Sequence, residues 1–182
     1  ISYIFINLKK FKLNMFNKNN FILTVFILVG VLTRIIPHPP NFTAIGAIAL
    51  FGGAFFVDKR LSFLIPISIM LISDFLLGYQ MIFSVYISFF IMVFLGFRLA
   101  KKHTTIKIIN TSIIASIIFF IITNLSVFLT SALYSKNILG LIECYTLAIP
   151  FFMNTLVANI FYSILMFNAF SLVKKRIIID LK

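Results

Sequence analysis

The sequence predicts an all-α protein: a bundle of six transmembrane helices with both termini in the cytoplasm. Three observations predict this fold. Of the 182 residues, 62% are hydrophobic and 11% are charged, whereas soluble domains carry about 25% charged residues. Six apolar segments approach the roughly 20 residues that a membrane-spanning helix needs. Basic residues gather in alternate connections between these segments, as the positive-inside rule expects of cytoplasmic loops.

The expected spans, in chain order, are 21–36, 42–57, 61–77, 81–100, 108–133 and 147–173. None alternates with the period of two that membrane β-strands show, and helices are the other structure that lipid permits. We therefore expect a cytoplasmic segment at 1–19, one transmembrane domain at 20–173 and a basic cytoplasmic tail at 174–182. The first methionine is Met15, so residues 1–14 are hypothesised to be translated upstream sequence, and Ile1 and Met15 both stay open as the start.

The basic residues decide the orientation. The four regions expected inside the cell hold 14 of the 16 lysines and arginines, and the opposite side holds only Arg34 and Lys136. This segregation needs an even number of spans and indicates a multi-pass protein of the inner (plasma) membrane. The net charge of +12 therefore does not indicate nucleic acid as a partner, because the basic residues flank apolar spans. The single cysteine, Cys144, excludes an internal disulfide and a cysteine metal cluster.

A compact polar segment lies between the first two expected spans, at residues 34–43, and contains Arg34, His38 and Asn41 among three prolines. Polar and ionisable groups are costly near lipid, so such a cluster suggests a function. Asp74 is the one acid inside an expected span. Arg34 and Asp74 should lie at equal depth, about 5–6 Å below the outer boundary, which permits an ion pair. The alternative is that Arg34 reaches the membrane surface alone.

Further polar residues fall in the outer halves of the later spans, and these include Asn124 in the fifth and Asn154 in the sixth. Together they predict a polar pocket that opens to the outside. The alternative is ordinary hydrogen bonding between helices. The outward connection at 134–146 is expected to hold a short interfacial helix, with Ile138 and Tyr145 on its apolar face.

Small residues mark the second expected span. Ala49 and Gly53 lie four apart, a spacing that lets two helices approach closely. The partner helix belongs either to this chain or to another subunit. Pro66 and Pro150 are expected near the starts of their spans, where proline is tolerated.

The motif Arg-x-x-Pro-His-Pro-Pro-Asn-Phe-Thr at residues 34–43 resembles a family of uncharacterised bacterial integral membrane proteins. So do the following Gly-Ala-x-Ala-Leu-Phe-Gly-Gly-Ala, Ser73-Asp74 and the segment around Ile149-Pro150-Phe151-Phe152. That family is similar in turn to the S components of energy-coupling-factor transporters, which bind a vitamin or metal from outside. The resemblance implies a coupling transmembrane subunit with ATPases as a partner. S components, however, carry their small-residue docking motif on the first helix, and here it lies on the second span.

These observations lead to one main functional hypothesis. The protein is expected to be the substrate-binding subunit of an uptake transporter, embedded in membrane lipid. Arg34 and His38 would suit a carboxylate or phosphate. No cofactor, metal site or enzymatic activity is expected, because His38 and His103 fall on opposite sides and no nucleophile accompanies them. The alternative is a non-transporting scaffold or assembly protein that binds a partner helix through Ala49 and Gly53. The residues expected to bind the ligand are Arg34, His38, Asn41, Asp74, Asn124 and Asn154.

Overall fold

The computed structural model describes residues 25–100 and 103–179. Within them the chain forms six helical segments and no strand, which confirms the all-α fold class. The expected cytoplasmic segment at 1–19 lies outside the described residues. Of the tail expected at 174–182, residues 174–179 continue the last helix, and residues 180–182 lie outside the described part of the chain. The helices are Val25–Ile35, α2 (Ile45–Phe55), α3 (Lys59–Leu77), α4 (Phe83–Leu99), α5 (Thr105–Thr130) and α6 (Ile138–Ile179).

Three helices are long and apolar enough to cross a membrane: α3, α5 and the part of α6 from Ile138 to Leu172. The other three are apolar but shorter. At 1.5 Å per residue, the 11 residues of α2 extend about 16 Å, roughly half of the hydrocarbon core. The apolar run at 42–57 is longer than α2, because the turn after Pro39 and Pro40 delays the start of the helix until Ile45.

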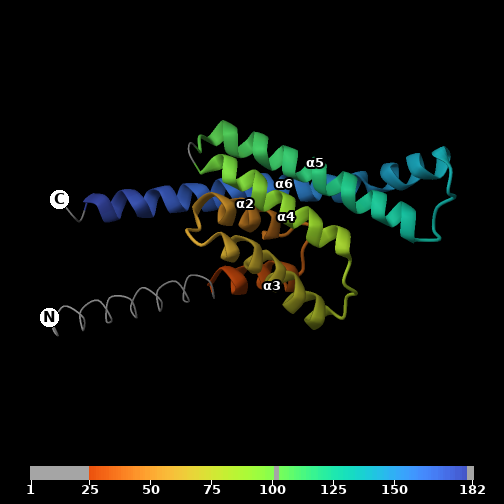
Figure 1. Ribbon diagram of the computed structural model, residues 1–182, viewed down its shortest axis with the longest axis horizontal. Coiled ribbons are helices and arrows are strands. Elements are labelled where there is room, and N and C mark those ends of the chain that lie inside the picture. Colours follow the sequence, from red (N-terminus) through yellow and green to blue (C-terminus); the bar gives the residue numbers. More distant parts are fainter. Residues whose placement is uncertain (1–24, 101–102, 180–182) are drawn as a thin grey trace.

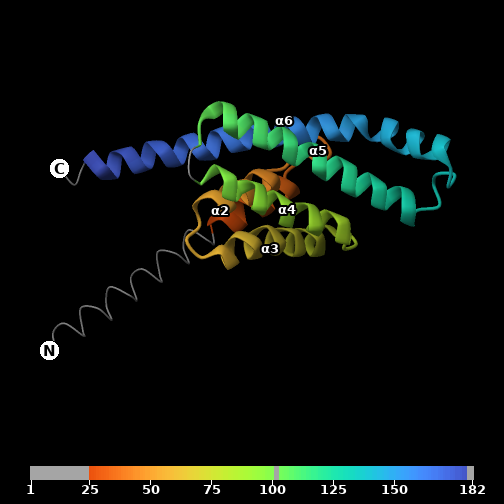
Figure 2. The ribbon, with the colours of Figure 1, turned by 45° about the horizontal axis from the view of Figure 1, so that its top comes forward.

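Helix α2 lies at the centre of the bundle and packs against α3, α4, α5 and α6, an arrangement that Figures 1 and 2 show from two sides. All of its residues except Phe55 are buried. The closest approach joins Gly53 of α2 to Gly96 of α4. A Cβ on either glycine would collide with backbone of the other helix. The short central helix is therefore surrounded by protein, and its polar backbone ends are covered by the connections on each side.

The ends of α3 follow from its sequence. Asp58 caps the start, where its carboxylate accepts a hydrogen bond from the Arg60 N–H at 2.9 Å. Gly78 ends the helix with a left-handed φ of 69°, a conformation that glycine adopts without strain. Pro66 lies inside the helix and does not stop it.

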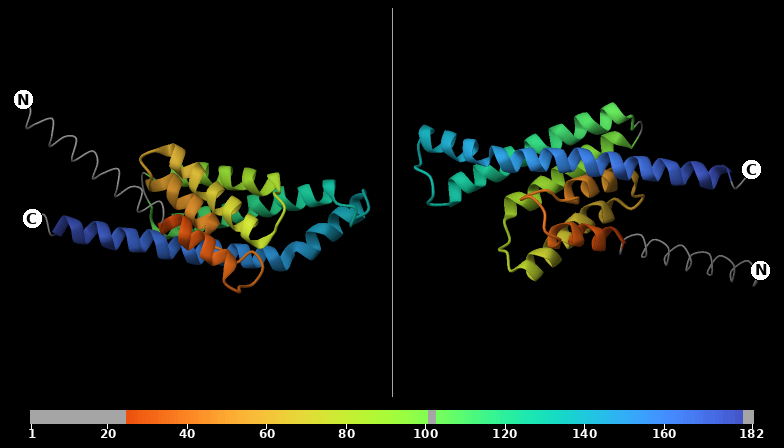
Figure 3. Two further views of the ribbon diagram at one scale, coloured as in Figure 1. Left: turned by 90° about the horizontal axis from the view of Figure 1, so that it is seen from below. Right: turned by 180° about the vertical axis from the view of Figure 1, so that it is seen from behind.

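Helix α6 corrects one expectation. The prediction of a separate interfacial helix at Ile138–Tyr145 is wrong, because these residues form the first two turns of α6. Asn137 starts the helix there, since its Oδ1 accepts a hydrogen bond from the Gly140 N–H at 2.9 Å. Pro150 therefore lies inside the helix and not near its start. Figure 3 shows that the first part of α6 is inclined to the rest, and an internal proline is a common cause of such a bend.

Candidate functional site

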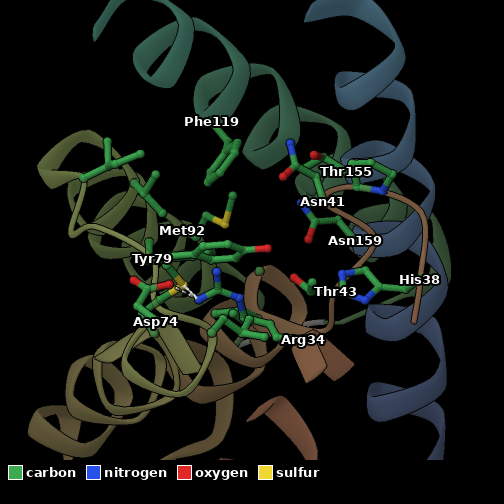
Figure 4. Close-up of a pocket in the computed structure, with 18 of the residues that line it drawn as sticks. Arg34, His38, Asn41, Thr43, Asp74, Tyr79, Met92, Phe119, Thr155 and Asn159 are labelled. Carbon is green, nitrogen blue, oxygen red and sulfur yellow. Dashed lines mark hydrogen bonds and ion pairs between the residues drawn. The ribbon is translucent and has the colours of Figure 1, made fainter. Parts of the chain in front are cut away.

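A cavity of about 610 Å³ lies at the end of the bundle where α2 begins and α3 ends. Two connections border it: residues 36–44, which lead into α2, and residues 78–82, between α3 and α4. Figure 4 shows Arg34 and Asp74 on one side of this cavity, with Asn41, Thr155 and Asn159 across from them. The lining residues are Arg34, His38, Pro40, Asn41, Thr43, Ile45, Gly46, Met70, Asp74, Leu77, Tyr79, Gln80, Ile82, Val85, Phe89, Met92, Phe119, Thr155 and Asn159.

The ion pair expected between Arg34 and Asp74 forms. Arg34 Nη1 lies 2.6 Å from Asp74 Oδ1, and the two side chains are 14% and 9% exposed. The same nitrogen also donates to Ser73 Oγ at 2.8 Å and lies 3.1 Å from Met70 Sδ. A guanidinium carries five N–H donors, and all the hydrogen bonds of Arg34 within the described residues use Nη1. Its other two nitrogens make no hydrogen bond to the described residues.

Asp74 uses both carboxylate oxygens. Oδ1 is paired with Arg34, and Oδ2 accepts a hydrogen bond from the Tyr86 hydroxyl at 3.1 Å. The carboxylate thus joins three helices, since Arg34 lies on the Val25–Ile35 helix, Asp74 on α3 and Tyr86 on α4. Because the charges of Arg34 and Asp74 compensate each other, this wall of the cavity carries hydrogen-bonding groups but no net charge.

The connection at residues 36–44 is held in one conformation by several hydrogen bonds. Asn41 adopts a left-handed φ of 65°, and the Phe42 N–H donates to Pro39 O at 2.9 Å. Asn154 on α6 donates from Nδ2 to Pro40 O at 2.9 Å. The ring of His38 is half-buried, and its Nδ1 lies 2.6 Å from Ile36 O. These contacts fix the positions of His38 and Asn41 at the wall of the cavity.

The opposite wall is formed by α6, where Asn159 is 2% exposed and donates from Nδ2 to Ser116 Oγ at 2.9 Å. Gly46 of α2 makes room for this amide, because a Cβ at Gly46 would collide with Asn159 Oδ1. One turn earlier, Thr155 lines the same wall. Much of the remaining surface is apolar and includes Phe89 and Met92 of α4 and Phe119 of α5.

The six expected ligand-binding residues do not all meet in this cavity. Arg34, His38, Asn41 and Asp74 line it. Asn124 lines a smaller adjoining cavity of about 190 Å³, where its Nδ2 donates to Phe120 O within its own helix at 2.8 Å. Asn154 lines neither cavity and instead holds the connection through Pro40.

Sequence reasoning also missed residues that belong to the site. Thr155 and Asn159 are four apart and therefore share one helix face, whereas Asn154 is one residue out of this register. That spacing was a signal in the sequence that could have selected Thr155 and Asn159. No comparable signal identified Tyr79, Met92 or Phe119, because aromatic and aliphatic residues are abundant throughout the chain.

Ala49 and Gly53, the small residues expected to let two helices approach closely, face the interior of this chain. Ala49 is fully buried, and Gly53 lies against Val93 and Gly96 of α4. The surface on which the scaffold alternative depended is therefore covered by α4.

Within residues 25–100 and 103–179, no three His, Cys, Asp or Glu side chains lie close enough together to hold a metal ion. The arrangement instead offers an open cavity, an internally neutralised ion pair, and amides and hydroxyls on opposite walls. Such a mixture of apolar lining and few convergent polar groups is typical of small-molecule binding sites.

One protein-family model matches residues 14–179, and the family is described as a family of unknown function (DUF6580). No curated protein and no solved structure matches the chain.

Proposed function

Since the chain belongs to the family of unknown function DUF6580, we propose a function from its own geometry: it is a membrane protein that binds a small molecule from the outer side and serves as the substrate-binding subunit of an uptake transporter. In this proposal all six helices are embedded in the plasma membrane, both termini are cytoplasmic, and the cavity faces outward.

The observation that carries the proposal is the cavity of about 610 Å³ with Arg34, His38, Asn41 and Asp74 in its lining. A volume of this size is in the range of ligand pockets, about 300–1,000 Å³. A scaffold that used these polar groups only to hold its helices together would be expected to fill this volume with side chains.

The charge distribution supports the orientation. Lys59 and Arg98 lie at the end of the bundle opposite the cavity, where the Lys59 ammonium lies 5.0 Å from the centre of the Phe97 ring. By the positive-inside rule this end faces the cytoplasm, so the cavity faces out. The resemblance to S components supports a partner that supplies energy, namely a coupling transmembrane subunit with ATPases. This part of the proposal is an analogy of fold and size.

The test is a thermal-shift screen of small molecules, both water-soluble and lipid-soluble, against the purified chain, followed by binding measurements on two tryptophan variants. Phe119→Trp adds volume inside the cavity, whereas Ile117→Trp adds the same indole at an exposed position on α5. We expect a ligand that raises the melting temperature of the wild type and of Ile117→Trp but binds Phe119→Trp at least about tenfold more weakly, a loss of about 1.4 kcal/mol. Equal binding to both variants would place the ligand elsewhere and refute the proposed site.

A further inference from the structure

The rim of the cavity is largely apolar along the connection between α3 and α4, where the one exposed polar side chain that lines the cavity is Gln80. Phe75 and Phe83, which flank the connection between α3 and α4, are 85% and 76% exposed. A protein surface that faces water seldom gathers so many large apolar side chains in one place. The other exposed apolar side chains of the rim are Ile35, Ile36, Leu76, Tyr79, Met81 and Ile82.

The hairpin of α5 and α6 extends past this rim. Figures 1 and 3 show its turn projecting well beyond the connection between α3 and α4. At 1.5 Å per residue, α5 is about 39 Å long and α4 about 26 Å. The projecting part carries many exposed apolar side chains, namely Leu125, Leu129, Leu133, Ile138, Leu139, Ile142 and Leu147. Lys136, Asn137, Glu143 and Thr146 are exposed there as well. If these side chains contact lipid, the rim of the cavity lies below the outer surface of the bilayer.

A side slot leads from the cavity toward this hairpin. The smaller cavity of about 190 Å³ shares Asn41, Val85, Phe119 and Thr155 with the larger one. Its remaining walls are Phe120, Thr123, Asn124, Val127, Phe151 and Phe152, from the facing surfaces of α5 and α6.

The two polar side chains of these walls are already hydrogen-bonded within α5. Thr123 Oγ1 donates to Phe119 O, and Asn124 Nδ2 donates to Phe120 O, both at 2.8 Å. Thr155 Oγ1 likewise donates to Phe151 O at 2.9 Å. Six of the ten side chains that line the slot are apolar, and the other four are Asn41, Thr123, Asn124 and Thr155.

From these observations we infer that the ligand is a lipid-soluble amphipathic molecule that enters from the outer leaflet. Its uncharged, hydrogen-bonding head lies in the main cavity near Arg34, Asp74 and Asn159, and its hydrocarbon chain follows the side slot toward the lipid. The head is uncharged because the ion pair leaves no net charge to compensate. This inference rests on the proposed function, since it assigns a chemical class of ligand to the same cavity.

The first test uses a monoacylglycerol that carries a photoactivatable diazirine in its acyl chain, added to the full chain in lipid nanodiscs. Val127→Trp fills the slot, whereas Leu129→Trp places the same indole on the exposed face of α5. We expect cross-links on slot residues of α5 and α6 in the wild type and in Leu129→Trp. The yield should fall about tenfold in Val127→Trp. Cross-links confined to exposed faces, or equal yields in both variants, would overturn the inference.

The outcomes separate this inference from the proposed function. A water-soluble ligand that is blocked by Phe119→Trp but unaffected by Val127→Trp, together with no slot cross-link, refutes the lipid-soluble ligand and leaves the binding function intact. Slot cross-links that disappear in both Phe119→Trp and Val127→Trp support the inference.

The second test measures the depth of the rim. A nitroxide is attached at Phe83→Cys or, for comparison, at Ser135→Cys in the turn between α5 and α6, each in a Cys144→Ser background. We expect molecular oxygen to broaden the Phe83→Cys signal more than a water-soluble nickel chelate does, and the opposite at Ser135→Cys. A rim label that the nickel chelate reaches as readily as it reaches the turn label would overturn entry from the bilayer.

Discussion

At the scale of single residues, the Arg34–Asp74 pair is the feature with the largest expected effect on stability. Arg34→Ala or Asp74→Ala leaves one nearly buried charge without its partner, which typically destabilises a protein by about 3–5 kcal/mol. The double variant Arg34→Ala/Asp74→Ala removes both charges and should cost less stability than the sum of the two single variants. Unfolding of each purified variant, assembled as a double-mutant cycle, measures this coupling.

Tyr86→Phe provides the control for that cycle. It removes one hydrogen bond to Asp74 Oδ2 and retains both charges, so it should cost only about 1 kcal/mol. If the two alanine variants are no less stable than Tyr86→Phe, the pair is not an important contact between the Val25–Ile35 helix and α3.

Asn41 allows a second prediction at this scale, because its φ of 65° is tolerated by glycine and asparagine but costs other residues roughly 1–2 kcal/mol. Asn41→Gly should keep the wild-type melting temperature, and Asn41→Val should lower it. Ligand binding should follow the same order, since this turn presents the connection to the cavity. Equal stability of the two variants would show that the turn relaxes without strain.

One successful inference from sequence was also at the residue scale. Arg34 and Asp74 could be paired because depth in a membrane helix follows directly from position in the chain. Asn154 was expected among the ligand-binding residues, but Asn159 and not Asn154 lines the cavity. Which of the two faces it depends on the rotation of α6, which packing against α2 and α5 determines. Counting polar residues by depth alone could not provide that rotation.

At the scale of helices, the crossing of α2 and α4 depends on two glycines. Gly53→Ala would place a Cβ against the Val93 carbonyl oxygen, which side-chain rotation cannot relieve. We therefore expect a loss of roughly 1–3 kcal/mol or more, as for overpacked cores, measured as resistance to denaturant in detergent.

Gly78→Ala is the matched control for this crossing. Gly78 also has a special conformation, with φ of 69°, but no atom lies within 4 Å of the position that a Cβ would occupy. Its substitution should cost only the backbone strain, about 1 kcal/mol. A Gly53→Ala variant as stable as Gly78→Ala would mean that α2 and α4 can separate at little cost.

The expected third span, 61–77, ends where α3 ends and begins two residues after the start of α3 at Lys59. Asp58 and Gly78 mark the ends of α3. The start of α6 was misplaced, because Pro150 was interpreted as lying near the beginning of a span. Asn137 is the actual start signal, and a single internal proline bends a long helix without ending it.

At the scale of the whole molecule, the two ends of the bundle differ in charge. Lys59, Arg60 and Arg98 lie at the end away from the cavity, and Lys107 follows in the first turn of α5 at that same end. The cavity end carries two basic residues. Arg34 is paired with Asp74, and Lys136 donates hydrogen bonds to the carbonyl oxygens of Phe128 and Ser131. The alternation of charge in the sequence thus corresponds to a separation in space, and this separation favours a cytoplasmic location for the basic end.

The orientation leads to the final prediction. Val57→Cys lies at the basic end, where Val57 is 99% exposed, and Ser135→Cys lies in the turn between α5 and α6. In a Cys144→Ser background, a membrane-impermeant maleimide added to intact cells should label Ser135→Cys and should label Val57→Cys only after permeabilisation. The reverse pattern would point the cavity toward the cytoplasm and refute uptake from outside. Labelling of both in intact cells would contradict the expectation that α3, α4 and α5 cross the membrane three times between these two positions.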